Sequence, residues 1–213
     1  MDQDTLLIAP KPELSPKRRQ ILAAAEELFL AQGYGAVSMD LVAKRANVSK
    51  ATLYAHFASK DQLFATIVDE RKLDIPLGPE MFPEDIADMA ALRAALERLG
   101  LTLLRFMLRE RTLAIYRIAL AEAGRFPELG QAFYQNGPCR MLNLFGDWLE
   151  VLRASGLVRV ENPRIACEQF TALMRSGVFL RRSLAVAPEP DEAEIEASVK
   201  AAANTWLAAF AAR

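Results

Sequence analysis

Residues 38–60 read SMDLVAKRANVSKATLYAHFASK, and this stretch predicts two short helices joined by a tight turn. Ser38 suits an N-cap, and apolar residues follow it at helical spacing. Asn47 then interrupts the pattern with a residue that enters the left-handed backbone region at low cost. Ser49 is a second candidate cap, before a helix rich in basic, hydroxyl and aromatic groups. These features describe a helix-turn-helix whose second helix begins at Ser49.

The flanking residues complete a three-helix unit. Ser15 followed by a proline predicts a helix over residues 16–32, which two glycines close. Ser59 and Gln62 form a capping box that opens a longer helix, ending before Pro76. Residues 1–14 contain two prolines and are expected to be a disordered arm.

The rest of the chain also has helical periodicity. Further helices are expected over residues 85–108, 112–123, 129–133, 138–155, 162–184 and 191–212. The dipeptide Gly137-Pro138 is interpreted as the break that starts one of them. Hydrophobic residues make up 52% of the 213 residues, and clusters of β-branched residues are scarce. The fold class is therefore predicted to be all-α.

The charge is distributed unevenly, although the formal net charge is only −1. Residues 11–60 hold eight Lys or Arg against four Asp or Glu, whereas residues 61–213 hold 18 against 21. Contacts with phosphate depend on the local field rather than on total charge. A basic N-terminal unit on a mildly acidic body is therefore compatible with binding to nucleic acid.

The sequence argues against catalysis and metal chemistry. His56 is the single histidine, and it lies within the helix-turn-helix. Nucleotide-binding and metalloprotease motifs are missing, and Cys139 and Cys167 lack the spacing of metal ligands. We therefore expect no enzyme activity, cofactor or metal. The chain has no apolar run of 18 residues and begins with acidic residues, which predicts a soluble cytoplasmic protein without a membrane partner.

At its N-terminal end the sequence resembles the TetR family of bacterial transcriptional regulators. The segments that carry this resemblance are Ile21–Leu28, Phe29, Gly33-Tyr34-Gly35, Val37-Ser38-Met39, Val48-Ser49-Lys50, Thr52-Leu53-Tyr54, His56-Phe57 and Ser59-Lys60. The family usually has glycine where Asn47 stands, and asparagine tolerates the same backbone. Residues 117–184, with the run Arg125-Phe126-Pro127-Glu128-Leu129, resemble the AefR-like type of C-terminal domain in that family. The resemblance implies a helix-turn-helix DNA-binding domain over 15–62 and a larger helical bundle over 63–213 for ligand binding and dimerisation.

The resemblance also implies which residues contact double-stranded DNA. Those that would face the major groove are Lys50, Ala51, Thr52 and Tyr54, and those resembling the family's phosphate contacts are Ser38, Tyr54, His56 and Lys60, with Ser49 at the helix start. Lysine can donate to guanine O6 and N7, and alanine and threonine methyl groups can touch a thymine methyl. The alternative is that Tyr54 and His56 are ordinary half-buried residues of a small packed helix.

Large flexible apolar residues recur at helical spacing in the body. Most must be core, but a helical bundle can enclose a cavity, and methionine with aromatic residues suits varied apolar ligands. The predicted pocket comprises Phe106, Tyr116, Phe145, Trp148 and Phe170.

The last two expected helices carry apolar stripes wide enough to cover a partner. By resemblance they pair with their two-fold mates in a four-helix bundle, and Gly177 would let two backbones approach closely. The predicted homodimer interface comprises Phe170, Leu173, Gly177, Leu180, Leu184, Val199, Trp206 and Phe210.

Two functions follow from the sequence. The first is a ligand-responsive transcriptional regulator, a repressor that a small apolar or amphipathic effector releases from a palindromic operator. The alternative is a regulator-like protein whose body has an enzymatic role or an effector-independent protein-binding role. The sequence specifies neither the operator nor the effector.

Overall fold

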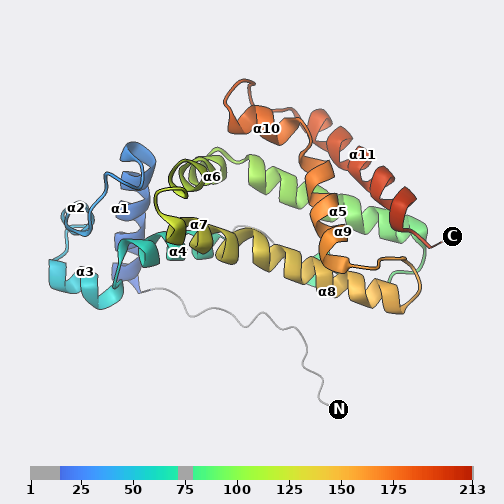
Figure 1. Ribbon diagram of the computed structural model, residues 1–213, viewed down its shortest axis with the longest axis horizontal. Coiled ribbons are helices and arrows are strands. Elements are labelled where there is room, and N and C mark those ends of the chain that lie inside the picture. Colours follow the sequence, from blue (N-terminus) through green and yellow to red (C-terminus); the bar gives the residue numbers. More distant parts are fainter. Residues whose placement is uncertain (1–14, 72–78, 213) are drawn as a thin grey trace, which may run out of the picture.

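The computed structural model describes residues 15–71 and 79–212, and the arm expected over residues 1–14 lies outside them. Helices form the described part of the chain, and the β-pairing found there is an isolated bridge between Val158 and Ala211. Figure 1 shows α1 to α3 at one end of the molecule, with the helices of the body extending away from them. The predicted all-α fold is confirmed.

The N-terminal unit has the helices that the sequence predicts. They are α1 (Pro16–Gln32), α2 (Met39–Arg45), α3 (Lys50–His56) and α4 (Lys60–Arg71). Ser15, Ser38 and Ser49 each accept a hydrogen bond from the backbone N–H three residues later, at 3.3, 3.2 and 3.0 Å. Asn47 has a φ of 50°, in the left-handed region expected of it. The capping box differs in one partner, because the Gln62 side chain accepts from the N–H of Ala58, at 2.6 Å.

We call the buried apolar side chains around these helices the N-terminal cluster. It includes Tyr34, Leu53, Phe57 and other side chains of α1 to α4, together with Ile115, Ala119 and Leu129 from the body. The α4 residues Leu63, Phe64, Ile67 and Val68 also belong to it. The domain boundary expected at residue 62 stays a prediction, while the packing of this unit extends further, through α4.

The body contains the remaining helices. They are η2 (Pro79–Met81), α5 (Met89–Leu108), α6 (Glu110–Glu122), α7 (Pro127–Tyr134), η3 (Gln135–Cys139), α8 (Arg140–Ala154), α9 (Pro163–Arg175), α10 (Val178–Ser183) and α11 (Glu192–Phe210). We call their buried apolar side chains, mainly from α5, α8, α9 and α11, the body cluster. At its centre the Phe170 ring lies 5.6 Å from Phe145 and 6.4 Å from Trp206, both nearly perpendicular to it.

Two helix boundaries differ from the prediction by a few residues. The helix expected from residue 85 begins at Met89, because the Asp88 carboxylate accepts from the N–H of Ala91 at 2.7 Å and caps it there. The helix expected over 112–123 spans Glu110–Glu122, directly after α5.

The break expected at Gly137-Pro138 is wrong. Residues 134–140 keep helical backbone angles, and the π-helix η3 joins α7 to α8. A π turn is wider than an α turn, with hydrogen bonds five residues apart. Proline cannot donate a backbone hydrogen bond, and here it lies inside that wider turn.

The single helix expected over 162–184 is also wrong, because the structure divides it into α9 and α10. Gly177 lies between them with φ 74° and ψ −58°, a backbone conformation that side chains with a Cβ rarely adopt. The glycine therefore turns the chain between α9 and α10, while its predicted role at a subunit interface stays a prediction.

Candidate DNA-binding surface

One face of α3 is open to solvent and the opposite face is buried. Lys50, Ala51 and Tyr54 are exposed, and the Tyr54 side chain keeps 51% of its surface accessible. Leu53 and Phe57, on the opposite face, are fully buried in the N-terminal cluster. The short helix therefore presents its first residues outward from a packed base, as a helix that enters a major groove requires.

The exposed face is polar and positively charged. The Lys50 ammonium lies 2.5 Å from a carboxylate oxygen of Asp40 in the first turn of α2, and its hydrogen bond to this carboxylate raises the pKa of Lys50. The hydroxyls of Ser49 and Thr52 lie 2.8 Å apart. Half-buried Thr52 is therefore held by the cap of its own helix, while Lys50 is held by an exposed and exchangeable ion pair.

Two α1 residues, Arg18 and Gln20, hold the two helices of the helix-turn-helix against α1. Arg18 donates to the backbone carbonyl of His56 at 3.2 Å, and its guanidinium lies 4.4 Å from the centre of the Phe57 ring. Gln20 donates to the carbonyl of Ala46 at 2.7 Å. Both side chains bond to a carbonyl at the end of a short helix, so they fix α2 and α3 against α1. A basic first turn in α1, which is unfavourable for the helix dipole, is the sequence signal for Arg18.

Lys60 lies away from the groove-facing residues. Its ammonium donates to the carbonyls of Tyr34 and Val37 at 2.8 and 2.9 Å. It also lies 4.2 and 5.3 Å from the ring centres of Tyr34 and Phe126, the latter in the body. Burial lowers the pKa of Lys60. The contact of Lys60 with phosphate stays a prediction, and in this structure its charge is held at the junction between the N-terminal unit and the body.

Besides Tyr54 and Lys60, two residues are predicted to contact phosphate, and they lie at opposite ends of the motif. Exposed Ser38 caps α2, and half-buried His56 ends α3. Their contact with DNA stays a prediction.

The predicted pocket residues fall into two groups. Phe145, Trp148 and Phe170 are buried in the body cluster, where the Phe145 ring lies 5.9 Å from Trp148. The Trp148 indole donates to the carbonyl of Pro83 at 2.8 Å. Phe106 and Tyr116 are half-buried, and the Tyr116 ring lies 5.1 Å from Phe179 of α10. The open groove that the structure shows lies elsewhere, between the start of α5 and the end of α11. The pocket therefore stays a prediction.

The predicted dimer residues are likewise divided. Phe170, Val199 and Trp206 are buried within their own subunit, and the Trp206 indole donates to the carbonyl of Ala166 at 2.9 Å. Their assignment to a subunit interface is wrong, because the body cluster already covers them. Leu180 and Leu184 are each 62% exposed. Half-buried Leu173 and Phe210 have accessible surface as well.

The fold and this surface define a helix-turn-helix DNA-binding protein with a helical C-terminal body. Residues 21–67 match the family described as bacterial regulatory proteins of the TetR family. Residues 94–212 match the C-terminal domain of AefR-like transcriptional repressors. The chain belongs to the TetR family of transcriptional regulators, which confirms the resemblance seen in the sequence. Members of this family regulate transcription and are not enzymes.

Solved structures are similar over nearly the whole chain. The flavonoid-responsive regulator FrrA is 34% identical, with a TM-score of 0.77 over 92% of this chain and 98% of its own. A TetR-family regulator from Pseudomonas syringae pv. tomato is 26% identical, with a TM-score of 0.69 over 93% of this chain and 99% of its own. The transcriptional activator FasR of Mycolicibacterium smegmatis is 39% identical over 82 residues, and this match spans 38% of the present chain and only 37% of FasR.

Other sites were sought in the described part of the chain. No helix there is long and apolar enough to cross a membrane. Among the same residues, no three His, Cys, Asp or Glu side chains gather in a way that could hold a metal ion.

Proposed function

We propose that this protein is a repressor that binds a palindromic operator as a homodimer and leaves it when a small apolar or amphipathic effector binds the body. The observation that carries the DNA-binding part is the exposed face of α3, with Lys50, Ala51 and Tyr54 on a capped and buttressed helix. FrrA is described as flavonoid-responsive, which supports an effector. FasR is described as an activator, so a reporter gene must decide the sign of regulation.

Sequence reading is assigned to the first residues of α3. Lys50 would exchange the Asp40 carboxylate for guanine O6 and N7, which costs little because the ion pair is exposed. Ala51 and Thr52 offer methyl groups to thymine, and Tyr54 offers its hydroxyl to a phosphate. Each residue acts from a helix whose backbone is already fixed.

The dimer is assigned to the outer faces of α9 and α11. Several exposed residues there are small or uncharged, among them Gln169 and Ala172 on α9, Ser176 at its C-cap, and Ala201 and Thr205 on α11. Small side chains let two helices pack closely across a two-fold axis, and the exposed Leu180 and Leu184 extend the face. Two recognition helices must lie about 34–36 Å apart to enter successive major grooves, which a symmetric pair provides.

The effector is assigned to the side of the body cluster nearest the N-terminal unit. The Tyr116 ring of α6 lies tilted against Phe133, with centres 6.1 Å apart, and edge-to-face against Phe179, with centres 5.1 Å apart. Tyr116 and Phe133 are half-buried and Phe179 is buried. Tyr116 and Phe133 belong to α6 and α7, the body helices that also pack on the N-terminal cluster. An aromatic or amphipathic molecule between them would change α6 and α7, which contribute Ile115 and Leu129 to that cluster.

The first experiment selects binding sites from a random duplex library with wild-type protein and repeats the selection with Lys50→Ala. The variant should lose its preference at one base position, by about 1–3 kcal/mol. Arg153→Ala is the matched control, since Arg153 is also an exposed cation in an ion pair, 2.5 Å from Glu150 on α8. The control should select the wild-type site. A wild-type protein that enriches no site, or a Lys50→Ala profile equal to that of wild type, would contradict the assignment.

A further inference from the structure

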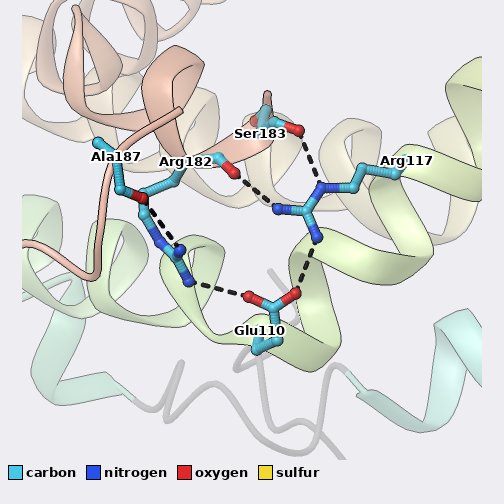
Figure 2. Close-up of polar contacts among 5 residues, drawn as sticks. All are labelled: Glu110, Arg117, Arg182, Ser183 and Ala187. Atoms are coloured by element: carbon cyan, nitrogen blue, oxygen red, sulfur yellow. Dashed lines mark hydrogen bonds and ion pairs between the residues drawn. The ribbon is translucent and has the colours of Figure 1, made fainter. Parts of the chain in front are cut away.

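Two consecutive residues at the start of α6 bind partners in different parts of the molecule. The Glu110 carboxylate accepts from Arg117 at 2.8 Å and from Arg182 of α10 at 2.9 Å (Figure 2). Arg111 points to the N-terminal unit, where its guanidinium binds both carboxylate oxygens of Glu26 in α1, one of them at 2.8 Å. The first turn of α6 thus lies between α10 and α1.

The contact with α10 is a polar network in which α6 binds the end of a helix. Arg117 donates to the backbone carbonyls of Arg182 and Ser183 at 2.6 and 2.8 Å (Figure 2). These carbonyls end α10, where a helix leaves acceptors unpaired and favours a cation. Two arginines on one carboxylate hold the pKa of Glu110 below its ordinary value, with the Arg117 hydrogen bond as the largest cause. Helix α6 is therefore fixed to α10 by charge and by helix capping together.

The contact with the N-terminal unit involves a buried charge. The Glu26 side chain is only 7% exposed, and among the described residues it is the one charged residue that counts as buried. A buried carboxylate needs a cation and hydrogen bonds to offset its lost hydration, and Arg111 supplies two bonds. At the other end of α6, the Glu122 carboxylate accepts from the N–H of Gly35 at 3.3 Å. The N-terminal unit is thus held by α6 at both ends of that helix.

We propose that the Glu26–Arg111 ion pair is an interdomain clasp that sets the orientation of the N-terminal unit for DNA binding. The Glu110–Arg117–Arg182 network keeps α6 in the position that closes this clasp. The inference rests on the proposed function, because it concerns how the body regulates the same DNA-binding surface. A movement of α10 is transmitted through Glu110 to its neighbour Arg111, and a bidentate pair is lost after a small displacement. The clasp is therefore a coupling element between body and DNA.

The test uses Arg111→Ala and Arg111→Lys, with operator affinity measured on the duplex selected by the wild-type protein. Arg111→Ala should weaken binding by about 5- to 150-fold, the usual range of coupling between sites. Arg111→Lys should restore part of the affinity, because it keeps the charge and loses the bidentate geometry. The slope of affinity against salt should not change, because Arg111 touches no phosphate in this assignment. A reduced salt slope would make Arg111 a DNA contact and overturn the clasp.

The matched control is Arg45→Ala. Arg45 binds Glu27, the residue next to Glu26, at 2.5 and 2.6 Å, but this pair joins α2 to α1 within the N-terminal unit. Its removal should change operator affinity less than removal of Arg111 does. Glu26→Gln combined with Arg111→Ala separates the effect on domain orientation from the cost of a buried charge, because the side chain at position 26 is then uncharged. This double variant should regain thermal stability relative to Arg111→Ala and still bind the operator weakly. Recovery of full affinity would show that only the charge of buried Glu26 mattered, and would overturn the proposal.

A double-mutant cycle tests the link to α10. Glu110→Gln should weaken operator binding when Arg111 is present and have little further effect in Arg111→Ala. Effects that simply add would separate the network from the clasp and overturn their coupling.

One measurement does not need DNA. Spin labels at the exposed positions Ala55 in α3 and Ala208 in α11 report the orientation of the N-terminal unit, in protein with Cys139→Ser and Cys167→Ala and diluted with unlabelled chains. Arg111→Ala should broaden the distance distribution and Arg45→Ala should not. An unchanged distribution would overturn the clasp. If the wild-type protein selected no duplex, the proposed function would fail, while this distance measurement would still test the clasp.

Discussion

The N-terminal unit and the body differ in how regularly their helices begin at a side-chain cap. Helices α1, α2 and α3 each begin after a serine whose hydroxyl accepts from the backbone of the first turn. In the body, α5, α9 and α11 have such a cap, whereas α6, α7, α8 and α10 begin without one. Three of these four follow the preceding helix with at most two residues between, so the backbone before them can satisfy N–H groups that a capping side chain would otherwise satisfy. Local chemistry therefore fixes the recognition unit, whereas packing decides where the body divides.

The largest expected effect tests whether the body acts on DNA only by pairing subunits. Ala201→Arg places a long cation on the exposed face of α11 that is proposed to meet a second copy. The protein should become monomeric, and operator affinity should fall by about 10³-fold, toward the non-specific level. Sedimentation and anisotropy titration measure the two quantities.

Ala154→Arg, at the exposed end of α8, is the control and should remain a dimer of wild-type affinity. Gly177→Arg is a poor test, because its positive φ would strain the turn between α9 and α10 whatever the assembly. A dimeric, fully active Ala201→Arg would place the interface on another face.

The next largest effect tests whether the N-terminal cluster and the body cluster unfold in separate transitions. Phe57→Ala removes a fully buried ring from the N-terminal cluster and should cost about 3–5 kcal/mol of folding free energy. Both tryptophans, Trp148 and Trp206, lie in the body cluster, so their fluorescence reports the body alone. Circular dichroism reports helices of both parts.

In urea, Phe57→Ala should unfold first by circular dichroism and later by fluorescence. Phe145→Ala, which opens the body cluster instead, should shift the fluorescence transition to lower urea. Coincident transitions in Phe57→Ala would show that Ile115, Ala119 and Leu129 join the two clusters into one cooperative unit.

The smallest effect compares two caps of similar geometry. Ser49 accepts from the N–H of Thr52 at 3.0 Å in the recognition helix, and Asn162 accepts from that of Ile165 at 3.1 Å in α9. Ser49→Ala and Asn162→Ala should each cost about 0.5–2 kcal/mol of stability in chemical denaturation. Only Ser49→Ala should also lower operator affinity, measured in the same buffer. Equal loss of affinity in both variants would mean that general stability, and not the start of α3, controls binding.

The sequence predicted the fold best where side chains act on their own backbone. Ser38, Asn47 and Ser49 lie within the motif that they shape, and their caps and turn can be recognised without tertiary structure. Gly137-Pro138 and Gly177 were misjudged for the opposite reason. Glycine followed by proline ordinarily ends a helix, but at Gly137-Pro138 a π turn accommodates both residues. At Gly177, in contrast, a glycine interrupts the helix. Packing of the body around each position makes that choice.

The site was predictable in part for the same reason. The alternation of Leu53 and Tyr54 on a short helix gives their buried and exposed faces directly. The predicted phosphate contact of Lys60 rests on the family resemblance, and no local pattern indicates the two loop carbonyls and the ring of the body that it meets here. Arg111 and Glu26, separated by 85 residues, carry no local signal that they meet.

The π turn at Gln135–Cys139 also determines how the two segments that it joins can pack. An α-helix rotates by about 100° for each residue, so one additional residue in a turn reorients everything beyond it by roughly that angle. Here α7 packs near α4 of the N-terminal unit, whereas α8, along the same continuous rod, packs on α9. The wider turn lets these two segments pack on different partners with no loop between them. Deletion of one residue near Pro138 would rotate α8 against α7, so one of the two packings would be lost.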